Sequence, residues 1–138
     1  MNERQLKAHM STAFIYANLS RCERKKVGCV IVKDNNIISI GYNGSPKGWD
    51  NTCEDCNNQT MPHIIHAEAN AILKLARTQG GGKDSHVFIT CSPCTSCALL
   101  LATMEVAAVY YSDVYRGTEG IELLLQHNIP VYNLTINQ

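Results

Sequence analysis

The chain has 138 residues, of which 45% are hydrophobic and 17% are charged, and its 12 basic and 12 acidic residues give a formal net charge of zero. This length and composition are typical of a globular protein, and we expect a single domain over residues 1–138. They exclude an intrinsically disordered chain, and the lack of a broad positive charge argues against a protein that works on nucleic acid. A small-molecule substrate is favoured.

The N-terminal sequence MNERQLKAHM lacks the apolar segment of a secretion signal, and no apolar run approaches the roughly 20 residues that cross a bilayer. We therefore expect a soluble protein in the cytoplasm of a bacterial cell or of a virus-infected host cell. The chain has seven cysteines. Because the cytosol keeps thiols reduced, these cysteines favour metal binding or catalysis over a disulfide framework.

The predicted elements begin with an amphipathic helix over residues 3–20, where apolar residues recur at helical spacing. Two β-rich runs around Asp34, Asn35 and Asn36 then predict an antiparallel hairpin with a short polar turn. A glycine-rich loop and a long polar segment follow. The remaining predicted elements are a helix over 66–79, a strand over 86–91, a helix over 93–104, a strand over 106–113, a helix over 120–128 and a strand over 129–134.

The order of these elements is one helix, two strands and then three pairs of a helix and a strand. Strands that alternate with helices pair in parallel, so the second half of the chain predicts parallel strands beside the antiparallel hairpin. The sequence therefore predicts an α/β fold with a mixed five-stranded sheet that is covered by helices.

Three potential metal ligands lie at the starts of two predicted helices. His66 begins one of them, and Cys94 and Cys97 begin the helix that Pro93 opens. Catalytic zinc takes three protein ligands, with histidine nitrogen and cysteine sulfur among its usual donors, and keeps a fourth position for water. The spacing of the two cysteines puts both sulfurs on one face, and helix N-termini stabilise thiolates. We predict a catalytic zinc held by His66, Cys94 and Cys97.

Each part of this pattern has a simpler interpretation by itself. A histidine beside an apolar helix is usually a hydrogen-bonded structural residue, and C-x-x-C is also the motif of thiol redox pairs. The combination of H-A-E with P-C-x-x-C, with 27 residues between His66 and Cys94, is far more specific.

Glu68 follows His66 by two residues and is not needed as a zinc ligand. Residues two apart face away from each other inside a helix, but in a first turn both can reach a site beyond the helix end. As a free carboxylate, Glu68 can take a proton from an attacking water, give it to a ring nitrogen of the substrate and pass a second proton to a departing amine. We predict that Glu68 is the catalytic acid and base.

The segments HAEANAI and SPCTSC, joined by VGCVIVK, GYNGSPKG and SDVY, resemble the deoxycytidylate (dCMP) deaminase family of the zinc-dependent cytidine deaminases. The resemblance covers nearly the whole chain. It implies a three-layer cytidine-deaminase-like fold with helices on both faces of the sheet, and a homo-oligomer that is commonly a hexamer. It also implies hydrolytic deamination of dCMP to dUMP with release of ammonia, which supplies dUMP for thymidylate synthesis.

The resemblance also implies roles for residues of the substrate site. Asn43 matches the asparagine that contacts the sugar, Ala67 the backbone position that reads the cytosine edge, and Tyr115 the tyrosine that stacks on the base. For the substrate phosphate the sequence offers three basic residues and does not decide among them: Arg24, Lys26 and Arg116. The basic run RCERKK, which contains two of them, is also compatible with a simple solvated surface.

The glycine-rich loop resembles the family segment that binds allosteric nucleotide triphosphates. The resemblance implies activation by dCTP and inhibition by dTTP, with magnesium accompanying the triphosphates. The residues predicted to bind these effectors are Gly41, Tyr42, Gly44, Ser45, Pro46, Lys47 and Gly48. The spacing alone is equally compatible with an ordinary turn.

A second, structural zinc is predicted for the polar segment before the H-A-E motif. Cys53 and Cys56 form another C-x-x-C, His63 follows seven residues later, and Cys22 ends the first helix region. These four residues make a closed Cys₃His set, which would tie down an otherwise structureless loop. The alternative is that they are free thiols of a polar loop.

Two other functions are weighed against dCMP deamination. A base deaminase that acts on nucleic acid, such as transfer RNA, would use the same chemistry, but zero net charge and the lack of a basic tail count against it. A non-catalytic zinc-binding module is disfavoured by Glu68, because a structural site needs no uncoordinated carboxylate and closes its fourth position with another ligand.

Overall fold

The computed structural model describes residues 1–78, 80–115 and 117–136. Its helices and strands follow the predicted order, with boundaries that differ from the predicted ones by a few residues. In chain order they are α1 (Glu3–Ala17), β1 (Gly28–Lys33), β2 (Asn36–Tyr42), α2 (Ala67–Ala76), β3 (His86–Cys91), α3 (Thr95–Thr103), β4 (Ala108–Asp113), α4 (Glu119–Gln126) and β5 (Val131–Asn133).

The five strands form one mixed sheet in the order β2-β1-β3-β4-β5, which confirms the predicted fold class. β1 is antiparallel to both β2 and β3, whereas β3, β4 and β5 run parallel. The hairpin turn consists of Asp34 and Asn35, whose φ angles are 51° and 62°. Positive φ at both central residues is the geometry of a type I′ turn, which matches the twist of paired strands and which Asp and Asn tolerate.

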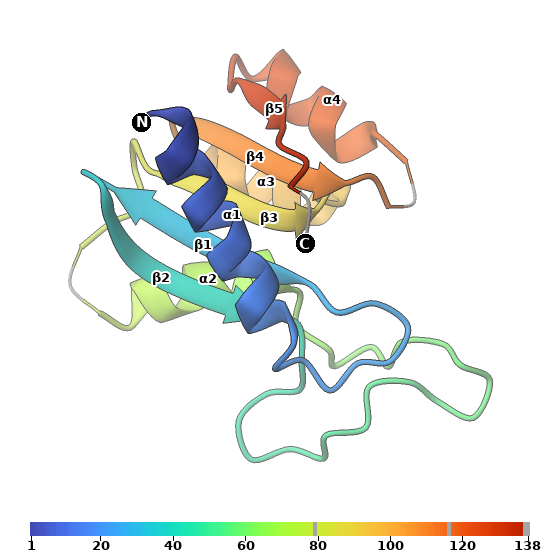
Figure 1. Cartoon of the computed structure of the whole chain (residues 1–138). Coiled ribbons are helices and arrows are strands. Elements are labelled where there is room, and N and C mark those ends of the chain that lie inside the picture. Colours follow the sequence, from blue (N-terminus) through green and yellow to red (C-terminus); the bar gives the residue numbers. More distant parts are fainter. Residues whose placement is uncertain (79, 116, 137–138) are drawn as a thin grey trace.

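Helices cover both faces of the sheet (Figure 1). On one face α1 buries Met10 and Ala13 against Val30, Phe88 and Tyr110. On the other face α2, α3 and α4 pack against the strands in a larger core. The buried residues that these three helices contribute to it are Ala67, Ala71, Leu75, Ala98, Leu101 and Leu124. The sheet is therefore the middle layer of three, as predicted.

The segment between β2 and α2 contains only two isolated bridges, Gly44 with Ile65 and Glu54 with Thr60. It extends away from the sheet together with the loop that follows α1 (Figure 1). None of the helices in the described ranges has both the length and the apolar character that crossing a membrane requires.

Two glycines bring helices into backbone contact with the sheet. A Cβ atom on Gly28 would lie 1.9 Å from the carbonyl oxygen of Ala13 in α1, and one on Gly41 would lie 2.4 Å from the carbonyl oxygen of Ala67 in α2. Neither position has room for a side chain. The distance of α2 from β2 is thus set at the point where the helix begins.

We predict that Gly28→Ala lowers the free energy of unfolding by at least about 2 kcal/mol, because the added methyl group must displace backbone rather than a side chain. Urea denaturation measures the effect. Gly81→Ala is the matched control, since a Cβ there meets nothing within 4 Å, and we expect it to change stability by less than about 0.5 kcal/mol. Equal effects of the two substitutions would contradict the packing argument.

Candidate active site

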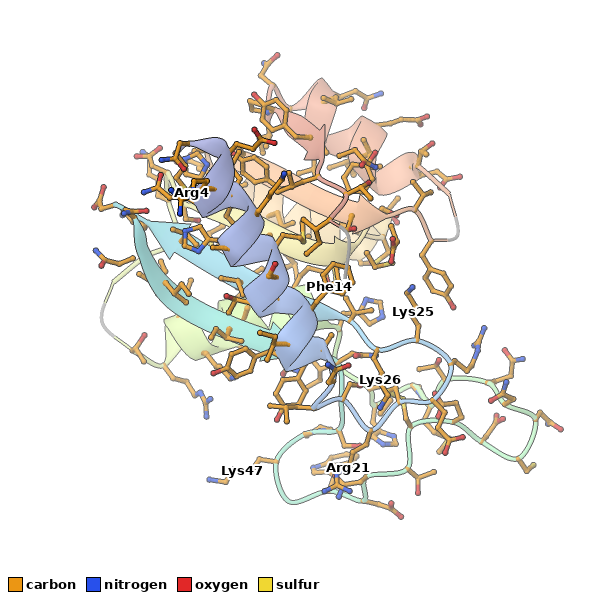
Figure 2. All side chains as sticks on the ribbon, viewed as in Figure 1. Arg4, Phe14, Arg21, Lys25, Lys26 and Lys47 are labelled. Carbon is orange, nitrogen blue, oxygen red and sulfur yellow. A yellow bond between two sulfur atoms is a disulfide. The ribbon has the colours of Figure 1, made fainter. Side chains whose placement is uncertain are left out.

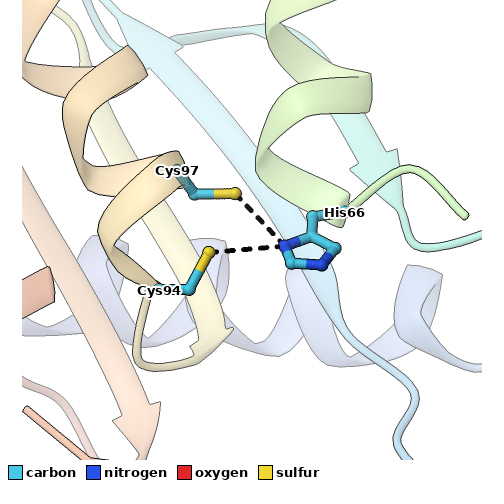
Figure 3. Close-up of side chains that lie close together, drawn as sticks. All are labelled: His66, Cys94 and Cys97. Carbon is cyan, nitrogen blue, oxygen red and sulfur yellow. Dashed lines mark hydrogen bonds between the residues drawn. The ribbon is translucent and has the colours of Figure 1, made fainter. Parts of the chain in front are cut away.

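The three predicted zinc ligands meet where two helices begin (Figure 3). His66 is the N-cap residue of α2 and Cys94 that of α3, and Cys97 lies in the first turn of α3. The Nδ1 atom of His66 is 3.5 Å from the sulfur of Cys94 and 3.4 Å from that of Cys97. Neither N-cap side chain forms a capping hydrogen bond with its helix, and both side chains face the site.

These separations fit a tetrahedral zinc ion. Zn–N and Zn–S bonds are about 2.0 and 2.3 Å long, so the tetrahedral angle places a nitrogen and a sulfur ligand about 3.5 Å apart. All three ligand atoms lie within 4.8 Å of one another. The geometry supports the predicted set of three protein ligands, and no fourth ligand belongs to this group among the described residues.

The thiols of the two cysteines in this set have pKa values that are shifted in opposite directions. Hydrogen bonds that the sulfur of Cys94 accepts from Cys97 and His66 lower the pKa of Cys94 to about 3. The same bond to Cys94, together with burial, raises the pKa of Cys97. Cys94 is therefore a thiolate, and a divalent cation would displace the proton of Cys97, because cysteine binds metals in its deprotonated form.

The loop that carries Cys94 packs directly against the start of α4. A Cβ on Gly120 would lie 2.1 Å from the carbonyl oxygen of Pro93 and 2.9 Å from that of Cys94. Glycine lets the start of α4 touch this backbone directly. The position of the thiolate is therefore determined by close packing of this loop against the start of α4.

Glu68 lies in the first turn of α2 and is only 4% exposed. Burial raises the pKa of Glu68 to about 7, because a charged carboxylate loses its hydration there. Its side chain also hydrogen-bonds to Cys97. A carboxylate that is near half-protonation at neutral pH, beside a potential metal centre, is suited to take up and release protons.

A cavity of about 180 Å³ opens beside these groups. Its wall combines the loop after α1, the segment before α2, the start of α2 and the ends of β3 and β4. The lining residues are Cys22, Arg24, Lys25, Val27, Asn43, Cys53, Glu54, Thr60, Ile64, His66, Ala67, Glu68, Cys91, Ser92, Cys94 and Tyr115.

Four of the six predicted substrate-binding residues line this cavity, namely Arg24, Asn43, Ala67 and Tyr115. Lys26 is not among the lining residues, because its ammonium group donates a hydrogen bond to the carbonyl oxygen of Ser20 instead. Its predicted phosphate contact is therefore not supported by its position. Arg116 lies outside the described residues.

Asn43 holds the loop after α1 against the end of β2. Its Oδ1 atom accepts a hydrogen bond of 2.9 Å from the backbone N–H of Val27, and its Nδ2 atom donates one of 2.9 Å to the carbonyl oxygen of Lys25. The amide group has four hydrogen-bonding positions in all. The predicted contact with a sugar is therefore compatible with this structural role.

Sequence reasoning did not assign three residues that shape the cavity. Lys25 lines it directly. The hydroxyl oxygen of Ser92 accepts a hydrogen bond of 3.0 Å from the backbone N–H of Tyr115, and the carboxylate of Glu54 accepts one of 3.2 Å from that of Arg24. The basic run in the sequence was a signal for Lys25, but an irregular loop has no periodicity that tells which side chains face a site.

The predicted effector segment is divided between β2 and the loop beyond it. Gly41 is buried in contact with the backbone of α2. This contact accounts for a glycine at position 41, and no bound nucleotide is needed to explain it. Gly44 pairs with Ile65, and a Cβ on Gly44 would meet nothing within 4 Å. Lys47 is exposed and projects from the loop away from the rest of the chain (Figure 2).

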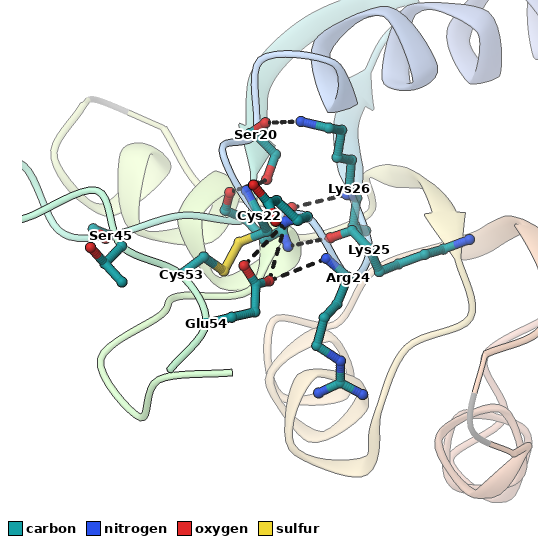
Figure 4. Close-up of a disulfide and its surroundings, with 12 residues drawn as sticks. Ser20, Cys22, Arg24, Lys25, Lys26, Ser45, Cys53 and Glu54 are labelled. Carbon is teal, nitrogen blue, oxygen red and sulfur yellow. Dashed lines mark hydrogen bonds between the residues drawn. A yellow bond between two sulfur atoms is a disulfide. The ribbon is translucent and has the colours of Figure 1, made fainter. Parts of the chain in front are cut away.

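The predicted second zinc site differs from what the structure shows. Cys22 and Cys53 form a disulfide, beside which lies the carboxylate of Glu54 (Figure 4). Cys56 and His63 belong to neither group of potential metal ligands found among the described residues. The four residues of the predicted Cys₃His set thus do not come together.

Local contacts explain why the last two residues lie apart from the disulfide. Cys56 sits exposed in a turn that is closed by the carboxylate of Asp55, which accepts hydrogen bonds from the backbone N–H groups of Asn57 and Gln59. The ring of His63 stacks on Trp49 with 5.5 Å between the ring centroids. Spacing in the sequence could not reveal either contact.

Comparison with known proteins is consistent with this site. The family model of the cytidine and deoxycytidylate deaminase zinc-binding region matches residues 3–113. The deoxycytidylate deaminase of Saccharomyces cerevisiae is 34% identical over 94% of this chain, and that of Homo sapiens is 32% identical over 80% of it. The alignments span 44% of the yeast protein and 66% of the human one, so this chain matches less than two thirds of these relatives.

One solved structure is similar over almost its full length. It is the dCMP deaminase of cyanophage S-TIM5 in complex with dCMP and dUMP, with a TM-score of 0.95, 38% identity and coverage of 97% of this chain and 99% of the phage chain. The fold and the site thus define a zinc-binding deaminase domain. The chain belongs to the cytidine and deoxycytidylate deaminase family.

We predict that His66→Ala and Cys94→Ser lose bound zinc, because each removes one of three protein ligands. Ser92→Ala is the control: Ser92 neighbours the cysteines and is not a ligand, so it should keep the parental zinc content. Elemental analysis of purified protein measures zinc per chain. Parental zinc content in either ligand variant would contradict the assignment. Equal loss of zinc in all three variants would contradict it as well.

Proposed function

We propose that this chain catalyses the hydrolytic deamination of dCMP to dUMP with release of ammonia. The observation that carries the proposal is Glu68, a buried carboxylate with a raised pKa beside the His66, Cys94 and Cys97 set and on the wall of the cavity. A purely structural metal site has no use for such a group.

The lining of the cavity supports a nucleotide substrate. A flat base would lie between Ala67, at the start of α2, and the ring of Tyr115, beyond the end of β4. The similarity to a phage enzyme in complex with dCMP and dUMP supports the particular nucleotide. Asn43 is the residue we propose for the sugar.

Zinc bound by His66, Cys94 and Cys97 would act as a Lewis acid that makes water a nucleophile at neutral pH. Glu68 takes one proton from the attacking water and delivers it to the ring nitrogen next to the amine-bearing carbon. The water oxygen bonds to that carbon, and Glu68 passes the second proton to the amine as the C–N bond breaks. The products are dUMP and ammonia, and Glu68 ends in its starting protonation state.

The proposal extends to the cellular role and the assembly of the protein. We propose that it acts in the cytoplasm, where its product is a precursor of thymidylate, and that it forms a homo-oligomer, in the first place a hexamer. Leu73 of α2 and Leu99 and Leu100 of α3 support self-association, because they are 51%, 53% and 44% exposed on the helical layer.

A second zinc ion also stays a proposal, with different ligands from those predicted. The sulfurs of Cys22 and Cys53 and a carboxylate oxygen of Glu54 lie within 4.8 Å of one another, so the reduced cysteines and Glu54 would form its site. The metal count of protein purified under reducing conditions decides between one ion and two.

We further propose that dCTP activates and dTTP inhibits the reaction by binding, with magnesium, at the segment from Gly41 to Gly48. Exposure of Lys47 supports this role, since a free ammonium group can meet phosphate charge. The segment begins in the last two residues of β2 and includes Asn43, so an effector bound there lies next to a residue that we assign to the substrate sugar.

We predict that Glu68→Gln keeps its zinc and loses deamination by about 10²- to 10⁴-fold, because the amide preserves shape but cannot shuttle protons. Loss of cytosine absorbance with dCMP measures the rate. A variant that deaminates dCMP at near the parental rate would exclude Glu68 as the acid and base. A parent protein that leaves dCMP unchanged would refute the proposed function itself.

For regulation, we predict sigmoidal dCMP saturation with dTTP and hyperbolic saturation with dCTP, with apparent dCMP affinity changing several-fold to about a hundredfold. Gly44→Val should abolish both responses, because the valine side chain would fill space in the loop where the effector is proposed to bind. The substitution should not strain the protein, since a Cβ on Gly44 meets nothing within 4 Å. Saturation curves in the presence of magnesium provide the measurement. Parental responses that survive in Gly44→Val would remove this segment from regulation.

A further inference from the structure

β3 and β4 run parallel and end at the same edge of the sheet (Figure 1). Their last paired residues are Cys91 and Asp113. One further backbone hydrogen bond, 2.7 Å long, runs from the N–H of Ser92 to the carbonyl oxygen of Asp113. The pairing of the two strands therefore continues as far as Ser92, which lines the cavity and is only 7% exposed.

The next hydrogen bond departs from the regular pattern of parallel strands. The bonds of a parallel ladder are evenly spaced, so in this register the N–H of Tyr115 would donate to the backbone carbonyl oxygen of Ser92. It donates instead to the hydroxyl oxygen of Ser92, over a distance of 3.0 Å. A side chain thus replaces the backbone as the acceptor, and Tyr115 stays attached to β3 although it lies two residues beyond the end of β4.

This hydrogen bond holds the residue whose ring we expect to contact the base. Tyr115 lines the cavity together with Ala67, at the start of α2. The ammonium nitrogen of Lys25 lies 5.7 Å from the centre of the tyrosine ring, but the side chain of Lys25 is 34% exposed, and a solvated contact of this kind contributes little. Loss of the bond to Ser92 costs more, because it also removes the partner of a partly buried N–H.

We propose that Ser92 is a positioning residue: its hydroxyl group holds the backbone of Tyr115 so that the ring lies along the cavity wall and can stack on a cytosine base. Ser92 acts through Tyr115 and not by its own contact with the substrate. The inference rests on the proposed function for the identity of the base, and it adds a residue that determines affinity for that base. Neither the zinc ligands nor the H-A-E and P-C-x-x-C motifs assign a role to this hydroxyl group.

A positioning role differs in its effects from a purely structural one. A ring that stacks on the base contacts the ground state and the transition state alike, so its displacement should weaken substrate binding and leave the reaction step unchanged. Cys94 lies two residues after Ser92. A general disturbance of this loop would therefore also reach the metal site and lower both the zinc content and kcat.

The test is a double-mutant cycle on the binding of dUMP, measured by titration calorimetry of the zinc-loaded protein. Ser92→Ala removes the acceptor and should weaken binding by about 5- to 20-fold. Tyr115→Ala removes the ring, keeps the backbone N–H and should weaken binding by about 10- to 100-fold. In the Tyr115→Ala background, Ser92→Ala should cause no further loss, because no ring remains to be positioned.

Kinetic assays supply a second measurement. Ser92→Ala should raise KM for dCMP by the same factor as it weakens dUMP binding, with kcat and zinc content at the parental values. Ser85→Ala is the matched control. Ser85 is also buried and its hydroxyl group donates to a backbone carbonyl oxygen, that of Gly82, but it lies at the opposite end of β3 and does not line the cavity. We expect it to keep the parental dUMP affinity.

Parental dUMP affinity in Ser92→Ala would overturn the positioning role. An equal loss of affinity with and without the tyrosine ring would do so too, because Ser92 would then act independently of Tyr115. Parental affinity in Tyr115→Ala, or loss of zinc from Ser92→Ala, would also contradict the proposal.

This inference and the proposed reaction can fail separately, because binding of dUMP requires no catalysis. A parent protein that leaves dCMP unchanged but gives the expected double-mutant cycle would refute the reaction and uphold the role of Ser92. A parent that deaminates dCMP, with a Ser92→Ala variant of unchanged KM, would uphold the reaction and refute that role. A parent that does not bind dUMP would refute both.

Discussion

Two helices that come from separate parts of the chain must begin at the same point in space, and the chemistry of the site depends on this convergence. The start of α2 carries His66 and Glu68, and the start of α3 carries Cys94. Gly41 and Gly120 hold these starts by direct backbone contact with β2 and α4. Such contacts leave little freedom, because interiors are packed as densely as crystals. The ligand atoms therefore stay within the distances that a zinc ion requires.

The meeting of the N-termini of α2 and α3 also explains the electrostatics of the site. Two helix N-termini place unpaired N–H groups and positive dipole ends at one spot, which favours a thiolate at Cys94. Burial of the same spot disfavours charge on Glu68, because a carboxylate has fewer solvating groups there than in water. One arrangement of helices thus produces a metal-binding anion and, next to it, a carboxyl group that exchanges protons near neutral pH.

The opposite wall of the cavity is built in another way. It consists of irregular segments, which are held by hydrogen bonds between side chains and backbone, such as those of Asn43 and Glu54, and by the disulfide of Cys22 and Cys53. Packing of the core does not determine the shape of these segments. Substrate recognition therefore depends on polar contacts between loops, whereas the reaction centre depends on the helices and the sheet.

The sequence by itself determined the order of the elements, a hairpin turn around Asp34, Asn35 and Asn36, and the chemical groups of the H-A-E and P-C-x-x-C motifs. These features depend on local periodicity, turn preference and residue type, all of which are properties of short segments. Helix ends were less predictable: the helix expected over 66–79 spans Ala67–Ala76. Only the tertiary structure decided that Lys25 lines the cavity and Lys26 does not, and that Cys22 meets Cys53 without Cys56 and His63. In an irregular loop the direction of a side chain is set by contacts with residues distant in the sequence, and neither spacing nor composition contains that information.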